Sequence, residues 1–467
     1  MWVFGGCVVF RVFRDPSGEN MLSQLLAERV NDPICVGIIG TGKFGGGLLA
    51  QMSRMKGMVP AVIADLEPER ALNVLAASGI DKSTVRIVES ATAICDTVRE
   101  GKTAVVADGL LLAQCEDVEV VVEATGVPEV GARMAFEAIN NGKHVVMVNV
   151  EADVTIGAQL RRLADSAGVV YTLVDGDQPG CTMNMIDWAR ALGFEVVAAG
   201  RGTVMFDDDR EGVPDTVPKR FGFSDELIER RTINFKMYNS FRDGSKAQLE
   251  MTALANMAGL VPDVRGMHEP SVNIEEIAQA CSLKDEGGLL GQHGVVELAN
   301  SVAVDGKTML ANPLKMGVFA VIRTDHQFTQ EDLKDYNLHP GGNGNYLLYR
   351  PYHLVAVEAP ISIAKAALFG LPTGSPLPTP TAEVVAVAKR DLKIGEPLDG
   401  SGGYTVNGLC EKATVAREQN LLPLGLASDV VMKTDVAKGE AIQYDDVELD
   451  EDSFVLKLRR LQDATVW

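Results

Sequence analysis

The stretch from Cys35 to Asp65 constrains the fold of this chain more than any other. It reads CVGIIGTGKFGGGLLAQMSRMKGMVPAVIAD: an apolar run, glycines at 40, 42 and 45, and then apolar residues at helical spacing. A second apolar run ends at Asp65, twenty residues after Gly45. This order of strand, glycine turn, helix, strand and acid predicts the first unit of a dinucleotide-binding fold.

The glycines of this turn have separate physical roles. Gly40 permits the tight turn, Gly42 lets the backbone approach a pyrophosphate, and Gly45 lets the helix pack closely on its strand. The pyrophosphate is expected at the N-terminus of the helix, where unpaired N–H groups favour an anion. Lys43 and Phe44, which lie within the turn, are therefore also expected to bind the cofactor.

The acid at the end of the second strand bears on which cofactor is used. Asp65 is expected to accept hydrogen bonds from a ribose diol, which favours NAD. Arg70 follows five residues later and can instead meet a 2′-phosphate. The sequence therefore leaves NAD and NADP both open.

Three further apolar runs, 118–123, 144–150 and 169–174, alternate with segments of helical spacing. Such alternation predicts an α/β fold with a doubly wound parallel sheet. Ligands of these sheets bind at the carboxyl ends of the strands. The residues delivered to that edge, and so expected to bind the cofactor, are Ala124, Thr125, Gly126 and Asn149.

The pattern changes after about residue 180. Segments 193–202, 232–239 and 346–349 are predicted as strands and 247–258 as a helix, which indicates an α+β catalytic and dimerisation domain. The proline-rich segment 371–380 is typical of a linker. Beyond it, 389–396 (KRDLKIGE) matches 433–440 (KTDVAKGE), a repeat that predicts a small β domain. The predicted organisation is an extension 1–20, an NAD(P)-binding Rossmann domain 21–180, a catalytic domain 181–370, a linker 371–380 and a β-rich domain 381–467.

Composition narrows the class of protein. A net charge of −21 argues against a nucleic-acid partner, because phosphate binding depends on clustered lysine and arginine. No apolar run reaches the ~18–20 residues needed to span a membrane. The seven cysteines are scattered without a CxxC pair, which suits a reducing compartment. We therefore expect a cytoplasmic protein.

Several motifs together resemble a known family. They are the glycine turn, ATGVPEVG at 124–131, NGKH at 141–144, NVEADVTIG at 149–157, DGSK at 243–246, GLVPD at 259–263 and RPYHL at 350–354. The chain resembles the homoserine-dehydrogenase-like oxidoreductases that carry a C-terminal SAF domain. Within these it is most similar to the deoxyxylulose-5-phosphate reductoisomerase-like (DRL) enzymes. The resemblance extends from about residue 31 to 463.

The resemblance implies an activity and an assembly. It implies NADPH-dependent conversion of 1-deoxy-D-xylulose 5-phosphate to 2-C-methyl-D-erythritol 4-phosphate, in isoprenoid precursor synthesis, by a homodimer. Asp65 and the acidic loop 175–180 (DGDQPG) depart from what such a substrate and cofactor require. Two alternatives therefore stay open: an oxidoreductase of another small polyol, sugar acid or amino alcohol, and a non-catalytic nucleotide-sensing protein.

A reductoisomerase must clamp an anion, polarise a carbonyl and relay a proton. Lys246 and Arg350 are the candidates for the anion and the carbonyl oxygen, and Tyr352 and His353 for placing hydroxyls or moving a proton. We expect these four side chains to lie together at the carboxyl edge of the sheet, near the nicotinamide. Two further candidates complete the predicted set: Asp243, to orient Lys246, and Asn149, to hold substrate or nicotinamide.

Carboxylates between residues 151 and 250 can supply oxygen ligands to Mg²⁺ or Mn²⁺. Their spacing does not specify a metal site, and helix capping explains such residues equally well. The requirement for a metal therefore stays open. The carboxylates concerned are Glu151, Asp153, Asp175, Asp177 and Glu250.

Overall fold

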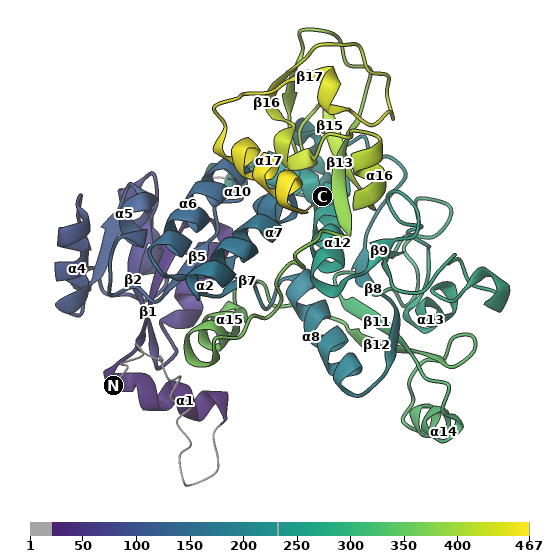
Figure 1. Cartoon of the computed structure of the whole chain (residues 1–467), viewed down its shortest axis with the longest axis horizontal. Coiled ribbons are helices and arrows are strands. Elements are labelled where there is room, and N and C mark those ends of the chain that lie inside the picture. Colours follow the sequence, from purple (N-terminus) through teal and green to yellow (C-terminus); the bar gives the residue numbers. More distant parts are fainter. Residues whose placement is uncertain (1–20, 231–232, 467) are drawn as a thin grey trace, which may run out of the picture.

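The computed structural model describes residues 21–230 and 233–466, so the extension predicted at 1–20 lies outside the described residues. Figure 1 shows three parts: an N-terminal domain in purple and blue, a central domain in teal and green, and a C-terminal domain in yellow-green and yellow. We use these names for residues 21–180, 181–370 and 381–466. The boundary predicted at 180 falls inside helix α8 (Gln178–Ala191), which leads from the first part into the second.

The N-terminal domain is built on a seven-stranded sheet in the order β3-β4-β2-β1-β5-β6-β7, and all neighbouring strands are parallel. This confirms the predicted doubly wound α/β fold. The strands are β1 (Ile34–Ile39), β2 (Met58–Ala64), β3 (Val85–Ile87), β4 (Thr103–Val106), β5 (Val120–Glu123), β6 (His144–Met147) and β7 (Tyr171–Leu173).

Helices cover both faces of this sheet, because successive strand residues point to opposite sides. In β5, Val120 and Val122 face one apolar cluster and Val121 faces the other. One face packs on α1 (Leu22–Glu28), α2 (Lys43–Met52), α3 (Pro68–Ala77) and, from the central domain, α15 (Ala359–Ala364). The other packs on α4 (Ala91–Arg99), α5 (Gly109–Ala113), α6 (Pro128–Asn140) and α7 (Val150–Ala167).

The central domain holds a five-stranded mixed sheet in the order β12-β11-β8-β10-β9. Its strands are β8 (Glu195–Thr203), β9 (Val261–Pro262), β10 (Val295–Asn300), β11 (Val318–Arg323) and β12 (Asn345–Arg350). Helices α8 and α12 (Ser245–Ala258) pack against it. The remaining helices are α9 (Val217–Phe221), α10 (Asp225–Arg230), α11 (Phe235–Arg242), α13 (Ile277–Ala280) and α14 (Gln327–Asp335).

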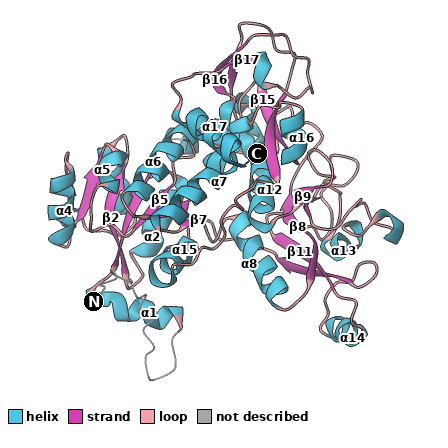
Figure 2. Cartoon of the chain, viewed as in Figure 1, coloured by secondary structure: helices cyan, strands magenta, loops and turns pink. Residues whose placement is uncertain are grey.

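The C-terminal domain is small, and Figure 2 shows that much of it is loop. Its strands are β13 (Ala382–Ala388), β14 (Pro397–Asp399), β15 (Val406–Lys412), β16 (Ser428–Met432) and β17 (Val447–Glu448), and its helices are α16 (Ala413–Glu418) and α17 (Phe454–Val466). The two repeats contact each other: Leu392 pairs with Val436, and the backbone N–H groups of Ile394 and Lys438 donate to carboxylates of the opposite repeat. The repeat read from the sequence is thus a structural repeat.

The C-terminal domain is bonded to helices of both other domains. On α12, the Ser245 hydroxyl accepts from the N–H of Gly408 at 3.0 Å, and the Gln248 amide accepts from the N–H of Cys410 at 2.8 Å. Helix α17 lies along α7, where the Gln462 amide accepts from the N–H of Gln159 at 3.0 Å (Figure 1). The prediction of a β-rich domain did not include α17.

One local prediction was wrong. Residues 233–239 are not a strand: α11 begins at Phe235 because the side chain of Asn234 accepts from the N–H of Met237 and caps it. The proline-rich segment connects the central and C-terminal domains and is hydrogen-bonded along its course. It lies beside β7, where the N–H of Leu173 donates to the carbonyl of Gly374 and the hydroxyl of Thr373 donates to Asp175.

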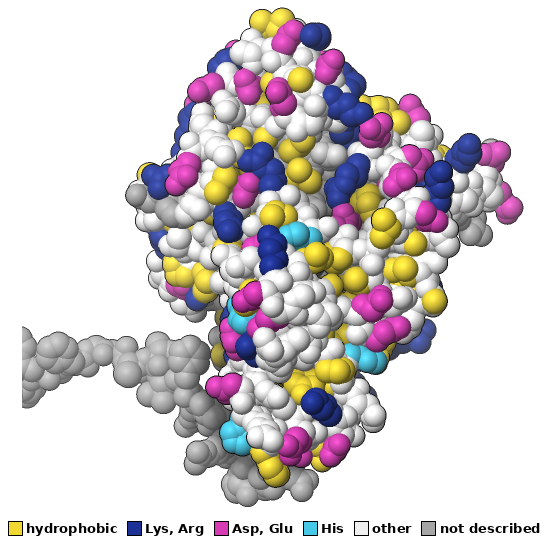
Figure 3. Space-filling model, turned by 90° about the vertical axis from the view of Figure 1, so that its right-hand side faces the viewer, with side chains coloured by type: hydrophobic (Ala, Val, Ile, Leu, Met, Phe, Trp, Pro, Cys, Tyr) yellow, Lys and Arg dark blue, Asp and Glu magenta, His cyan; other side chains and the backbone are white. Residues whose placement is uncertain are grey.

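Among the described residues, no helix combines the length and the apolar character needed to cross a membrane. On the face drawn in Figure 3, basic and acidic side chains are interspersed rather than gathered into one basic area.

Candidate active site

The glycine turn has the geometry expected of a dinucleotide cradle. Gly40 has a φ of 94°, and a Cβ on Gly45 would lie 2.1 Å from the carbonyl oxygen of Gly40, so neither position accepts a side chain. A Cβ on Gly42 would meet nothing within 4 Å, and the same holds for Gly126 in the neighbouring loop. Open space in front of both backbones fits a bound nicotinamide dinucleotide.

Asp65 lies at the end of β2, as predicted, but its carboxylate is already engaged. The N–H and hydroxyl of Thr41 donate to one oxygen, and Arg70 approaches the other at 2.6 Å. Burial alone would raise the pKa of Asp65, but the hydrogen bonds from Arg70 and Thr41 outweigh it and lower the pKa. The ionised Asp65 therefore braces the glycine turn, and a ribose diol has to share it with Arg70.

The loop after β5 is held by two buried residues. Glu123 accepts from the N–H of Thr125 at 2.9 Å, and its second oxygen has no partner among the described residues. Burial raises the pKa of Glu123 to about 7. Asn149 caps α7 and donates to the carbonyl of Val127 at 3.0 Å. With 1% of its surface exposed, Asn149 positions the cofactor loop rather than projecting into open space.

Lys246, near the start of α12, faces a group of carboxylates. Its Nζ lies 3.2 Å from Glu151 at the start of α7. Burial alone would lower the pKa of Lys246, but Glu151, Glu250 and Asp177 outweigh it and raise the pKa. The side chain is therefore a firmly charged donor, with 16% of its surface exposed.

Arg201 was missed by the sequence analysis. It lies in β8, where its guanidinium pairs with Glu250 and donates to the carbonyl of Gly202 at 3.0 Å. Burial raises the pKa of Glu250 to about 7 in spite of Arg201. The available signals were an arginine inside an apolar strand and the i, i+4 spacing of Lys246 and Glu250 on one helix.

Arg350 and Tyr352 stack, with the guanidinium 4.4 Å from the ring centroid. Arg350 also pairs with both oxygens of Glu358 and donates to the sulfur of Cys181 on α8. Because Lys246 and Arg350 each face a carboxylate of their own, a clamp for a phosphate is not preformed.

His353 lies beside the start of α8. Its Nδ1 is 2.8 Å from the carbonyl oxygen of Met316, which also accepts from Gln178 at 3.1 Å. Burial lowers the pKa of His353. Since a carbonyl only accepts, Nδ1 carries the proton, and Nε2 of the neutral ring keeps its lone pair.

The candidates from the two halves of the chain meet near α8, which follows the carboxyl end of β7. Asp177 caps α8 and acts electrostatically on both Lys246 and His353. The loop after Arg350 reaches α2, where a Cβ on Gly47 would lie 3.0 Å from that of Ala356. Lys43 of the glycine turn lies over the ring of Tyr238, on α11 of the central domain. The cluster thus lies between the cofactor turn and the central sheet.

Asp243 lies elsewhere, so the expectation that it orients Lys246 was wrong. Its carboxylate is 2.5 Å from Nζ of Lys389, a residue of the C-terminal domain, and also accepts from the N–H of Ser245. It joins two domains at the start of α12.

The predicted pool of metal ligands divides into two groups. Glu151, Asp177 and Glu250 surround Lys246. Asp175 is bonded to Ser362, Lys365 and Thr373, and Asp153 accepts from the hydroxyl of Tyr171 at 2.8 Å. Those two carboxylates are therefore structural, and the requirement for a metal stays a prediction.

The wild type is expected to lose stability when the buried Asp153 ionises near neutral pH, and Asp153→Asn should prevent this. Burial raises the pKa of Asp153 from 3.8 to about 7. The stabilising contribution of the protonated Asp153 is therefore fully present below about pH 4. It is lost as the pH rises through the folded-state pKa of about 7. At pH 8 the variant should be more stable than the wild type by about 4 kcal/mol, at ~1.36 kcal/mol per unit of pKa shift.

Urea unfolding at pH 5 and pH 8 measures this. Asp165→Asn is the matched control, because Asp165 lies on the same helix with 61% of its side chain exposed. Parallel pH dependence in Asp153→Asn and the wild type would contradict a proton held on Asp153.

Two family models match successive parts of the chain. Residues 40–173 match "Homoserine dehydrogenase, NAD binding domain", and residues 176–359 match "Oxidoreductase DRL, catalytic domain". The chain therefore carries an NAD-binding domain followed by the catalytic domain of an oxidoreductase. These matches end at residue 359, so a SAF domain at 381–467 stays a prediction.

A curated relative is a homoserine dehydrogenase from Pseudomonas aeruginosa, 27% identical over 242 residues. The match covers 49% of this chain and 49% of the relative, so the chain spans about half the length of that protein. Similar solved structures include an NAD-binding oxidoreductase from Klebsiella pneumoniae (18% identity, 39% of this chain and 45% of that one, TM-score 0.29). Another is a probable dehydrogenase from Thermotoga maritima (12% identity, 72% and 90%, TM-score 0.38).

Proposed function

We propose that this chain is an NAD(P)-dependent oxidoreductase that acts on a hydroxyl or carbonyl group of a small substrate held at Lys246. The observation that carries the proposal is a charged, mostly buried lysine inside the matched oxidoreductase domain, in a chain that also carries a cradle for a dinucleotide. The bound nicotinamide would supply or accept the hydride. Gly40, Gly42, Gly45 and the loop 124–126 would hold it.

The side chains around Lys246 suit the remaining steps. The Lys246 ammonium would donate to the substrate oxygen and stabilise the negative charge that develops there. Glu151 and Asp177 keep the ammonium charged and oriented. Nε2 of His353, with its free lone pair, would accept a proton from a substrate hydroxyl.

We propose a reductoisomerase-like reaction on 1-deoxy-D-xylulose 5-phosphate, with Mg²⁺ or Mn²⁺, as the first activity to test. The match of residues 176–359 to the DRL catalytic domain supports it. A specific observation favours a second candidate, an oxidoreductase of a polyol or amino alcohol. Lys246 and Arg350 are already paired with Glu151 and Glu358, and surplus carboxylate suits a neutral or cationic substrate better than a phosphate.

Absorbance of the reduced nicotinamide, measured with the purified chain, separates these candidates. Oxidation of NADPH or NADH by the sugar phosphate with a divalent metal would support the reductoisomerase. Reduction of NAD⁺ or NADP⁺ by amino alcohols or uncharged polyols, without turnover of the sugar phosphate, would support the second candidate. Cofactor binding without turnover on any substrate of the panel would instead favour the nucleotide-sensing alternative.

Arg70→Ala is expected to weaken NADPH binding about tenfold, equal to ~1.4 kcal/mol, and to leave NADH binding unchanged or stronger. The guanidinium is the cation nearest the ribose acid, at 2.6 Å, and 47% of its side chain is exposed. Without it, Asp65 would repel a 2′-phosphate and have an oxygen free for a ribose diol.

Fluorescence titration with each reduced cofactor measures this. Arg86→Ala is the matched control, since Arg86 is equally exposed on the same domain and pairs with Glu100. Equal losses for NADH and NADPH in Arg70→Ala would refute a role in selecting the cofactor.

We also propose a cytoplasmic homodimer whose C-terminal domain is of the SAF type. The family resemblance and the unpatterned thiols support these proposals.

A further inference from the structure

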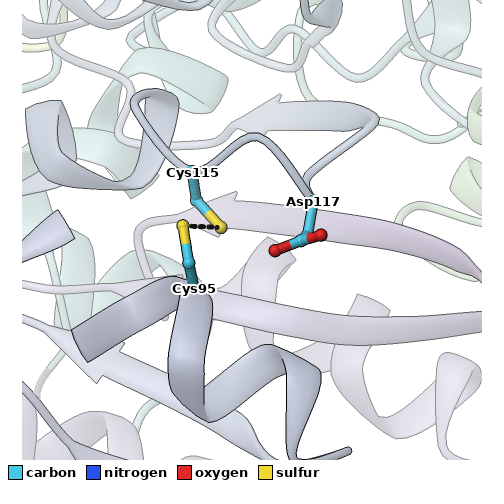
Figure 4. Close-up of side chains that lie close together, drawn as sticks. All are labelled: Cys95, Cys115 and Asp117. Carbon is cyan, nitrogen blue, oxygen red and sulfur yellow. Dashed lines mark hydrogen bonds between the residues drawn. The ribbon is translucent and has the colours of Figure 1, made fainter. Parts of the chain in front are cut away.

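Two thiols of the N-terminal domain point toward each other, as Figure 4 shows. Cys95 lies on α4 and Cys115 follows α5, and their Sγ atoms are 3.0 Å apart. Both residues precede a strand, β4 and β5 respectively. The pair therefore lies at the edge where the strands begin, opposite the edge that carries the glycine turn.

Positive charge lies close to both thiols. Lys143 is buried and donates to the carbonyl of Glu116 at 3.1 Å. Burial lowers the pKa of Lys143, whereas Cys115 and Cys95 act in the opposite direction, so the ammonium faces both sulfurs. Neighbouring cations favour the thiolate, which is the reactive form of cysteine, whereas burial raises the pKa of Cys115 to about 12.

The same side chains can be compared with a metal site. The ligand atoms of Cys95, Cys115 and Asp117 lie within 4.8 Å of one another. However, two thiolates on a tetrahedral zinc with bonds of about 2.3 Å stand about 3.8 Å apart, farther than these sulfurs. Asp117 is also paired with Arg99, whose Nε lies 3.1 Å from its carboxylate. Two nearby cations oppose a metal ion and leave thiol chemistry as the better explanation.

We propose that Cys95 and Cys115 are a modification site: they form a reversible disulfide when a small hydroperoxide oxidises them. The Cys95 thiolate attacks the peroxide, so an S–O bond forms, the O–O bond breaks and water or an alcohol leaves. The Cys115 thiol then attacks the sulfenic sulfur, so the S–S bond forms, the S–O bond breaks, and the sulfenic hydroxyl leaves as water with the proton of the Cys115 thiol. The two thiols lose two electrons and the peroxide gains them. A dithiol reverses the reaction by exchange.

Access and distance fit this order of events. Cys95 is partly exposed and Cys115 is buried, which makes Cys95 the residue attacked first. Arg99 and Asp117, which neighbour the pair, line a surface pocket of about 610 Å³, although neither Cys95 nor Cys115 lines it. The sulfurs need to approach by only about 1 Å to reach disulfide length.

Cys35 provides an internal control. It lines the pocket from β1, and burial together with Glu119 raises its pKa to about 11. Burial also raises the pKa of Cys115 to about 12, so the pKa does not separate these two residues. Cys115 contacts the thiol of Cys95, whereas Cys35 makes no thiol contact among the described residues. Cys35 should therefore form no disulfide where the pair is oxidised.

The test treats the full chain with hydrogen peroxide, blocks free thiols and maps the peptides by mass spectrometry. We expect a peptide pair linked through Cys95 and Cys115, lighter by about 2 Da and released by dithiothreitol. Cys35→Ser should keep the link and Cys95→Ser should lose it. Cys95→Ser carries the test even if the buried Cys115→Ser fails to fold.

Three results would overturn the proposal. One is that Cys95 and Cys115 stay fully alkylated after peroxide treatment. Another is that Cys95 passes to sulfinic acid without any linked peptide. The third is that the purified chain holds about one zinc ion that Cys95→Ser loses, which would make the cluster a metal site.

Discussion

Lys246→Ala is expected to lower kcat/KM by about 10²–10³-fold while leaving cofactor binding nearly unchanged, because it removes one preorganised donor to a developing negative charge. The glycine turn contributes no atom to the Lys246–Glu151 pair, so the dinucleotide cradle should survive the change. Lys246→Arg keeps the charge and should recover part of the lost activity. Turnover and cofactor titration with the substrate found in the panel measure both effects.

Lys365→Ala is the matched control for this variant. Lys365 pairs with Asp175 at the same distance of 3.2 Å, but this pair lies outside the cluster around Lys246. The control should change stability more than turnover. If Lys246→Ala and Lys365→Ala lower kcat/KM equally, the loss is structural and the proposed role of Lys246 is wrong.

Gly45→Ala is expected to lower stability, and Gly42→Ala to weaken cofactor binding. A Cβ on Gly45 would collide with the backbone oxygen of Gly40 at 2.1 Å, so Gly45→Ala should lower the free energy of unfolding by about 3 kcal/mol or more. Gly42 has a φ of −66° and open space in front of it, so Gly42→Ala should change stability by less than about 1 kcal/mol. Its methyl group would occupy the space meant for the pyrophosphate and weaken cofactor binding about tenfold or more.

Urea unfolding without cofactor and a titration with NADH and NADPH give the two readouts. Each variant serves as the control for the other. Wild-type cofactor affinity in Gly42→Ala would show that the dinucleotide binds away from this turn. An unchanged unfolding curve in Gly45→Ala would contradict the close contact of α2 with the first strand.

The cofactor half was predictable because its signals are local. Gly40, Gly42, Gly45 and Asp65 lie within one strand–helix–strand unit of about twenty-five residues. The alternation of apolar runs then sufficed to predict a parallel sheet. The ion pair of Asp65 with Arg70 could not be predicted. An arginine in the first turn of a helix near an acid can point toward that acid or toward solvent, and the sequence does not specify which.

The catalytic half was less predictable because its contacts join distant residues. Lys246 meets Glu151 across 95 positions, and Arg201 meets Glu250 across 49. Asp243 lies only three residues before Lys246 in the chain, yet its partner is Lys389 in another domain. Sequence spacing suggested a local role for Asp243, whereas the close packing of α12 on the C-terminal domain determines the observed one.

The bonds of the C-terminal domain to both α7 and α12 bear on how a substrate can enter. Enzymes with two domains often admit substrate by rotation about a hinge. Here the C-terminal domain connects α7, which carries Glu151, to α12, which carries Lys246. Such a rotation would therefore break the hydrogen bonds at Gln159, Ser245 and Gln248. Entry and release are therefore expected to depend on small local displacements of the 351–358 loop, with the distance between the two helices kept constant through the turnover cycle.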